Sequence, residues 1–268
     1  MVSQIFMPVK FGPSGLGGVK EAISNLEKYK ALGFTACELA FTYGAYIKKK
    51  EDAEKIGKAA EKLGIQLSIH GPYWVNLNSE DPEKIVKSKE RILESCKVGT
   101  WLNAKKVVIH PGFYGKMTPE ESYENIKRAI IELEAERKRL NYSCKFAIET
   151  TGKINVFGSV DETLKLVEET GCDFCVDFAH ILAREKSYKF DEVFEKFKNF
   201  NEIHIQFSGI NYTEKGERNH IETKREELKE LISHLPKDKH VTIINESPTP
   251  VEDSIKALEI YGKLRNFI

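Results

Sequence analysis

The chain has 268 residues, with 41 basic and 41 acidic side chains and 7 histidines, so its formal net charge at pH 7 is zero. A hydrophobic fraction of 41% is typical of a folded globular protein, and the neutral balance counts against nucleic-acid binding over the whole surface, although a local basic face is compatible with it. No stretch approaches the roughly 20 apolar residues that span a bilayer and the N-terminus lacks a signal-peptide pattern, so we expect a cytoplasmic monomer without a membrane partner.

Short apolar runs, rich in β-branched residues, alternate along the chain with longer segments of helical periodicity. This alternation predicts repeated strand–helix units around a parallel sheet. The predicted strands cover residues 4–9, 36–41, 65–70, 106–110, 145–149, 173–177, 202–206 and 241–245. The predicted helices cover residues 19–33, 51–64, 82–103, 119–141, 159–171, 190–199, 224–235 and 251–264.

These repeated units, without a break in composition, predict one closed (β/α)₈ TIM barrel of the α/β class, a single domain over residues 1–268. Two helices are expected to end at Gly64 and Gly171, because a helix end favours a residue that tolerates positive φ. Residues 12–18, GPSGLGG, are predicted to form a loop after the first strand. This segment lacks the Gly-Lys-Ser/Thr of a phosphate-binding loop.

Metal-ligating side chains occur in or just after the last six predicted strands. In a TIM barrel the carboxyl ends of the strands meet in one mouth, where active sites lie. Six consecutive strands that each bring a His, Asp or Glu to this mouth indicate a functional site. The strand residues are His70, His110, Glu149, Asp177, His204 and Glu246, and His180 and His220 occupy nearby loops.

A mixture of imidazoles and carboxylates favours a divalent transition metal, with Zn²⁺ the most natural ion and Mn²⁺ or Fe²⁺ the alternatives. More than four ligands indicate more than one ion. Two or three ions held close together can clamp a phosphoryl group, because one supplies hydroxide while the others stabilise the developing charge. Such a site needs no serine nucleophile, and the chain contains no G-x-S-x-G motif.

A family resemblance is carried by six short motifs: IHGPYWVNL (69–77), VIHPG (108–112), IET (148–150), VDFAH (176–180), IHIQ (203–206) and INES (244–247). The chain resembles the endonuclease IV family of zinc-dependent AP endonucleases, within the xylose-isomerase-like barrels. The resemblance implies one zinc held by His70, His110 and Glu149. It implies a second zinc bridged by Glu149 and completed by Asp177, His204 and Glu246.

A third zinc in that family takes a His at the position of His180, together with an Asp and a His from an Asp-x-His motif. Here His220 is present, but Arg218 stands two residues before it. Two interpretations stay open. Either Glu217 or Glu222 replaces the missing ligand, or the guanidinium of Arg218 contacts substrate where the family has a cation, since Arg pairs well with phosphate oxygens.

The resemblance implies a phosphodiesterase that cleaves DNA on the 5′ side of abasic sites, with Glu149, Asp177 and Glu246 as catalytic residues. In that family, side chains from the loop after the third strand insert into the DNA at the position of the missing base. The corresponding loop here carries Tyr73 and Trp74. Such a pair can stack in the gap at about 1–3 kcal/mol per base. Otherwise both rings pack over the barrel end.

A sugar isomerase or epimerase of the same barrel group is the alternative. Such an enzyme needs only four of these residues around one metal, with two glutamates as acid and base: Glu149, Asp177, His204 and Glu246. The additional histidines favour the nuclease, whereas the neutral charge and the missing Asp favour the isomerase. A non-catalytic barrel that keeps metal for stability is disfavoured, because structural zinc sites are usually closed and rich in cysteine.

Overall fold

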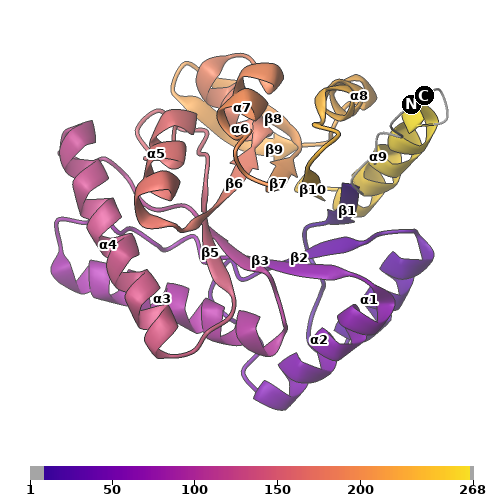
Figure 1. Cartoon of the computed structure of the whole chain (residues 1–268), viewed down its shortest axis with the longest axis horizontal. Helices are drawn as coiled ribbons and strands as arrows, with labels where there is room; N and C mark the ends of the chain where they lie inside the picture. The colour runs from indigo at the N-terminus through magenta and orange to yellow at the C-terminus, as the bar shows by residue number, and fades with distance from the viewer. Residues whose placement is uncertain (1–8, 266–268) are drawn as a thin grey trace.

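The structure is a computed structural model that describes residues 9–265, in which eight parallel strands form a barrel surrounded by helices (Figure 1). The strands are β1 (Val9–Pro13), β2 (Ala36–Ala40), β3 (Gln66–His70), β4 (Lys106–Ile109), β5 (Lys145–Glu149), β6 (Asp173–Asp177), β7 (Glu202–Phe207) and β10 (His240–Asn245). They pair in the order β1, β10, β7, β6, β5, β4, β3, β2. A parallel bridge between Ser14 and Glu38 brings β1 against β2, so the barrel is nearly closed. The predicted (β/α)₈ fold is confirmed.

The helices pack around the outside of the sheet (Figure 1). They are α1 (Ala22–Ala31), α2 (Lys50–Leu63), α3 (Pro82–Trp101), α4 (Pro119–Arg139), α5 (Val160–Thr170), α6 (Phe178–Glu185), α7 (Phe190–Lys196), α8 (Arg225–His234) and α9 (Pro250–Arg265). The predicted helical segments correspond to these apart from α6, with ends shifted by up to a few residues. Gly64 and Gly171 end α2 and α5 with φ of 70° and 72°, as expected. Within residues 9–265, no helix combines the length and apolar character that crossing a membrane requires.

The first strand differs from its prediction. Residues 4–8 of the predicted strand 4–9 lie outside the described residues, and β1 extends over Val9–Pro13, into the segment predicted as a loop. Gly12 explains the difference, because a Cβ at this position would lie 1.7 Å from the carbonyl oxygen of Ala36 on β2. Gly12 is therefore a strand residue, needed because β1 and β2 lie too close together for a side chain at this position. The predicted loop 12–18 begins only after Pro13.

An antiparallel hairpin, β8 (Gly209–Thr213) and β9 (Gly216–Ile221), follows β7 and packs against α6. The tip of the hairpin is fixed to the loop after β5, where the Glu217 amide donates to the Gly152 carbonyl at 3.1 Å. His220, which was expected in a loop, lies on β9 of this hairpin. The hairpin matters for function because it brings residues 217–220 over the barrel mouth.

The inside of the barrel is partly polar. Because successive side chains of a strand point to opposite faces, every second residue points inward. Val108, Ala147 and Cys175 form a small apolar cluster apart from the main core, which lies between the sheet and the helices. Four buried polar residues form a hydrogen-bonded network beside this cluster: Glu38, Ser68, His204 and Gln206.

Candidate metal centre

Three side chains meet at the carboxyl ends of β3, β4 and β5. His70 is the last residue of β3, His110 follows β4, and Glu149 is the last residue of β5. The Nε2 atom of His110 lies 2.9 Å from Glu149 Oε1, and the Nε2 atom of His70 lies 3.3 Å from Glu149 Oε2. Each residue offers one ligand atom, and these atoms lie within 4.8 Å of one another. The three therefore form a first ligand group, the set that the family resemblance implies for one metal.

A second ligand group lies beside the first. Asp177 ends β6 and caps α6, because its Oδ1 accepts a hydrogen bond from the His180 amide at 2.9 Å. The other oxygen, Oδ2, lies 3.5 Å from His180 Nδ1. His220 on β9 completes this group, whose three ligand atoms also lie within 4.8 Å of one another. His180 connects the two groups, since its Nδ1 is 2.9 Å from Glu149 Oε1.

Hydrogen bonds select which ring nitrogen is free for a metal. Nδ1 of His70 lies 2.8 Å from the carbonyl oxygen of Gly71, and Nδ1 of His180 lies 2.9 Å from that of Thr150. A carbonyl oxygen only accepts, so in the neutral imidazole that binds a metal each Nδ1 carries the proton and each Nε2 keeps its lone pair. Metal-ligating histidines are usually oriented in this way.

His220 is oriented by the same principle. Its Nδ1 lies 2.5 Å from the hydroxyl oxygen of Ser208. That hydroxyl donates its own proton to the Gly209 carbonyl at 2.9 Å, so it accepts from the imidazole and leaves Nε2 of His220 free.

A bulge in β9 decides which residue faces the second group. The register of β8 against β9 skips Arg218, which shifts the alternation of side chains along the strand. Glu217 and His220 consequently line the same cavity, whereas neither Arg218 nor Glu222 is part of its lining within the described residues. Glu217 Oε2 lies 3.4 Å from His180 Nε2. The geometry thus favours Glu217 as the residue that stands in for the missing Asp, and Arg218 is exposed.

Unpartnered buried atoms in both groups fit a metal ion. Nε2 of His110, both carboxylate oxygens of Glu149 and Oδ2 of Asp177 are buried and have no hydrogen-bond partner among the described residues. The neighbouring imidazoles are close to them but do not have hydrogen-bond geometry. Buried polar atoms are normally satisfied, and a cation in each group would satisfy these. Imidazole nitrogens with carboxylate oxygens are a ligand set for divalent transition metals.

The charges in the centre also favour a cation. Burial and the charge of Glu149 raise the pKa of Asp177 to about 7. Burial, with the charges of neighbouring carboxylates, raises the pKa of Glu246 well above its usual value. Burial by itself lowers the pKa of His70, but the adjacent carboxylate of Glu149 raises it to about 10. The centre binds protons tightly because its carboxylates are crowded together, and divalent ions would replace those protons.

His204 lies deeper in the barrel than predicted. β7 pairs with β6 so that Gln206, and not His204, is level with Asp177. His204 is buried, and its Nε2 atom lies 3.1 Å from Glu38 Oε2. Gln206 occupies the rim position and donates to Glu38 and to Glu246 at 2.6 and 3.0 Å. His204 therefore belongs to neither ligand group. Its depth could not be predicted, because inward-facing residues repeat at every second position of a strand and only the pairing register shows which of them reaches the rim.

Glu38 is a buried charged residue that was not among the predicted site residues. It is fully buried in the middle of β2 and accepts hydrogen bonds from Ser68, at 2.7 Å, and from Gln206. Burial opposes its ionisation, but the hydrogen bond and charge of His204 lower its pKa. The available signal was a single charged residue in the centre of the apolar strand ACELA.

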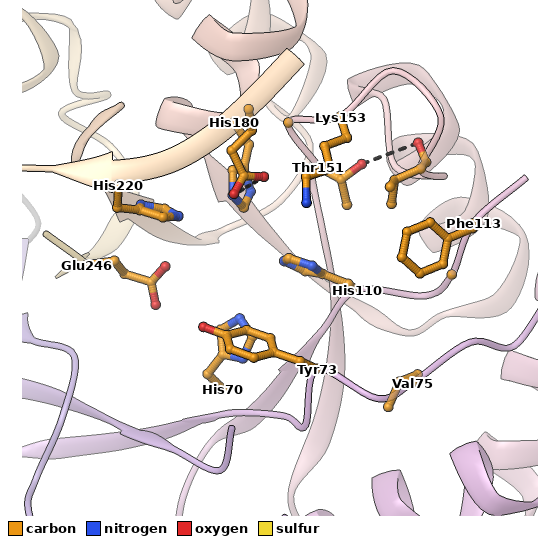
Figure 2. A pocket seen from close by; sticks show the side chains of 14 residues that line it. His70, Tyr73, Val75, His110, Phe113, Thr151, Lys153, His180, His220 and Glu246 are labelled. Carbon is orange, nitrogen blue, oxygen red and sulfur yellow. Dashed lines mark hydrogen bonds and ion pairs between the residues drawn. The ribbon is translucent and has the colours of Figure 1, made fainter. Parts of the chain in front are cut away.

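Both ligand groups open into a cavity of ≈ 340 Å³. Glu246 lines it, across from His110 (Figure 2). Tyr73 also lines the cavity, with its ring edge-on to His70 at 5.4 Å between centroids. Trp74 is outside the lining, and its carbonyl accepts a hydrogen bond from Arg91. Tyr73 and Trp74 are 60% and 63% exposed, so neither residue is buried at the barrel end.

The family model for xylose isomerase-like TIM barrels matches residues 26–260. The chain belongs to this family. An uncharacterized protein of Methanocaldococcus jannaschii, MJ0133, is 34% identical to this xylose isomerase-like barrel over 274 residues, which cover 95% of this chain and 97% of MJ0133. A probable endonuclease 4 of Mycoplasma mobile is 26% identical over 232 residues, which cover 80% of this chain and 79% of that protein.

Solved structures of two functional classes are similar to this xylose isomerase-like barrel. Endonuclease IV from Thermus thermophilus has a TM-score of 0.68 at 21% identity, covering 97% of this chain and 100% of that one. A D-tagatose 3-epimerase-like protein has a TM-score of 0.72 at 20% identity, covering 96% of this chain and 98% of that one. At these identities the likeness establishes the fold alone.

Proposed function

We propose that this xylose isomerase-like barrel is a metal-dependent phosphodiesterase that cleaves DNA on the 5′ side of abasic sites. The observation that carries the proposal is the pair of ligand groups side by side, connected where His180 Nδ1 lies 2.9 Å from Glu149 Oε1. Two ions held close together suit displacement at phosphorus. We propose two or three Zn²⁺ ions, with Mn²⁺ as the alternative.

The ions, when bound, supply hydroxide at neutral pH and stabilise charge on the phosphoryl oxygens. In the proposed reaction a water oxygen forms a bond to phosphorus and the bond from phosphorus to the 3′ oxygen breaks. The products are a 3′ hydroxyl and a 5′ phosphate on the abasic sugar. Glu246 lines the cavity outside both ligand groups, and burial raises its pKa well above the usual value, so it is the carboxyl group placed to pass a proton to the leaving oxygen. Glu149 lies between His70 and His110, with its oxygens 3.3 and 2.9 Å from their Nε2 atoms, where the three can share one ion.

Two further observations support DNA as the substrate. The Mycoplasma mobile relative that covers 80% of this chain is named a probable endonuclease 4. Tyr73 and Trp74 are more than half exposed beside the cavity, where they are free to stack against bases next to a gap in the duplex.

A sugar isomerase or epimerase is the second candidate, and the size of the cavity favours it. A cavity of ≈ 340 Å³ is near the lower end of ligand pockets, roughly 300–1,000 Å³, and suits a monosaccharide. That activity would need His204 at the metal, together with Glu149, Asp177 and Glu246. His204 instead faces Glu38, which removes a predicted ligand from both candidates. We rank the isomerase second because it needs one metal, whereas the centre has two ligand groups.

The test is incision of a duplex oligonucleotide with one tetrahydrofuran abasic analogue, by protein whose metal content is measured on the same sample. We expect metal-dependent cutting on the 5′ side of the analogue, lost in Glu149→Gln. Glu259→Gln is the control, since Glu259 pairs with Arg225 on the surface. Absence of incision by protein that holds two ions per chain would overturn the proposal and direct the search toward sugars and sugar phosphates.

A further inference from the structure

The cavity above the metal centre has a second, apolar end. Val75, Phe113 and Val156 all line it. Figure 2 shows Phe113 and Val75 on the side of His110 that faces away from His220. Val75 and Val156 are only 3% and 6% exposed, so these two side chains form a fixed wall next to the ligand groups.

Phe113 is held with its ring exposed. Its carbonyl accepts a hydrogen bond from Asn78 at 2.8 Å, its amide donates to Asn76 at 3.4 Å, and it forms a bridge with Val156. The residue is nevertheless 45% exposed, and within residues 9–265 its ring stacks on no other aromatic ring. An aromatic ring on a fixed backbone binds a planar partner at a small cost in conformational entropy.

Lys153 adds a positive charge to the same cavity. It lines the cavity on the loop after β5, and its ammonium group forms no ion pair within the described part of the chain. The cavity therefore combines a cation-binding end, an apolar wall with an exposed ring, and a basic side chain. A phosphate ester with a planar ring next to the phosphorus matches all three.

We propose that Val75, Phe113 and Val156 form a subsite for a nucleobase next to the scissile phosphate, with Phe113 as the stacking residue. The inference rests on the proposed function for the identity of that phosphate. In abasic DNA, one of the two nucleosides joined by the scissile phosphate has no base, so the subsite takes the base of the other, on the 5′ side. A cavity of ≈ 340 Å³ suits one nucleotide and not a base pair.

Binding tests the subsite without cleavage. Zinc-loaded protein is titrated in a calorimeter with thymidine 3′-monophosphate, which carries its phosphate on the same oxygen as the nucleoside on the 5′ side, and with the tetrahydrofuran 3′-phosphate, which differs by lacking the base. We expect the nucleotide to bind about 5- to 150-fold more tightly, the factor that corresponds to about 1–3 kcal/mol for one stacked base. Equal affinities in the wild type would overturn the inference.

Variants locate the stacking residue. Phe113→Ala should bring the affinity ratio close to one, and Phe113→Leu, which keeps apolar volume without a planar ring, should lower it part of the way. Ile154→Ala is the matched control, because Ile154 is 51% exposed on a neighbouring loop and lies outside the cavity lining. A ratio that survives Phe113→Ala, or that is lost in Tyr73→Ala instead, would overturn the assignment to Phe113.

Incision separates this inference from the proposed function. One duplex carries a single abasic analogue, and a second carries two in tandem, so that at the phosphate between the two analogues the nucleoside on the 5′ side also lacks its base. We expect kcat/KM for the cut between the two analogues to be lower, by a similar factor, than for the cut at the single analogue in the wild type, and the two values to be equal in Phe113→Ala. Equal values in the wild type overturn the subsite and leave the nuclease. Cutting of neither, with the nucleotide preference intact, overturns the nuclease and leaves the subsite.

Discussion

Gly216 and Gly152 meet backbone to backbone: a Cβ on Gly216 would lie 2.1 Å from the carbonyl oxygen of Gly152. Gly216 also has a φ of +93°, which side-chain-bearing residues rarely adopt. The contact fixes the tip of the β8–β9 hairpin to the loop after β5 and so keeps Glu217 and His220 at the cavity. The second ligand group therefore depends on two glycines that bind no metal.

Gly216→Ala should remove the metal of the second group and leave that of the first. The new Cβ cannot coexist with the Gly152 carbonyl, so the hairpin tip must move, while the first group lies on β3 to β5. We expect the zinc content, measured by mass spectrometry after desalting, to fall by about one ion per chain. Gly44→Ala is the control, because Gly44 has a φ of +115° with nothing within 4 Å of its Cβ position. Full zinc content in Gly216→Ala would show that hairpin docking is not required.

Glu217 and Arg218 should differ sharply in their effect on metal binding. Glu217→Gln removes a carboxylate 3.4 Å from His180 Nε2, whereas Arg218 is the exposed extra residue of the bulge. We expect Glu217→Gln to weaken binding of the second ion by at least about 10- to 100-fold, the loss typical of residues that only orient ligands. Arg218→Ala should leave the affinity unchanged. Competition titration with a zinc chelator measures the zinc affinity of both variants. A loss of affinity in Arg218→Ala, with none in Glu217→Gln, would show that Arg218 and not Glu217 contributes to the second ligand group.

Much of the barrel could be predicted from sequence because most of its strands can be recognised from their own residues, without knowledge of the strands they pair with. β5 and β6 begin and end where predicted, since each is a short apolar run that stops on a carboxylate at the barrel mouth. Gly12 could not be placed in β1 in this way. Its strand position follows from the carbonyl of Ala36 on a different strand, and a glycine next to Pro13 otherwise indicates a loop.

The candidate site was predictable where a ligand ends a strand and not where its depth depends on register. His70, His110 and Glu149 lie at strand ends, and the structure brings them together. His204 and Gln206 both point inward, so only the pairing of β7 with β6 shows which one reaches the rim. The bulge at Arg218 also depends on pairing, because the letters GERNH contain nothing that says which residue will be skipped.

Glu38→Ala should destabilise the fold strongly, although Glu38 lies in neither ligand group. Its carboxylate accepts hydrogen bonds from Ser68 and Gln206 and lies 3.1 Å from His204 Nε2, and all three are buried. Without the carboxylate, the buried donors of Ser68 and Gln206 lose their acceptor, and each unsatisfied buried group typically lowers the free energy of unfolding by about 1–3 kcal/mol. Urea denaturation of metal-free protein measures the loss. Glu259→Ala, at an exposed ion pair, should cost less than about 1 kcal/mol, and an equally small cost for Glu38→Ala would contradict the buried network.

Zinc should stabilise the protein more at about pH 8 than at about pH 5.5, because Asp177 titrates between them. The pKa of Asp177 is raised from 3.8 to about 7, so its contribution to the stability of metal-free protein is complete below pH 3.8 and is lost as the pH rises through 7. The pKa of His70 is raised from 6.5 to about 10, so its contribution is lost only as the pH rises toward 10.

Zinc needs an ionised carboxylate and neutral imidazoles, so its binding must displace these protons, which becomes easier as the pH rises. Differential scanning calorimetry with and without excess zinc should therefore show a larger rise in melting temperature at about pH 8 than at about pH 5.5. Calorimetric titration in buffers of different ionisation enthalpy should show proton release on binding. Asp177→Asn, which cannot ionise, should reduce the release near neutral pH, and equal zinc stabilisation at both pH values would contradict the raised pKa of Asp177.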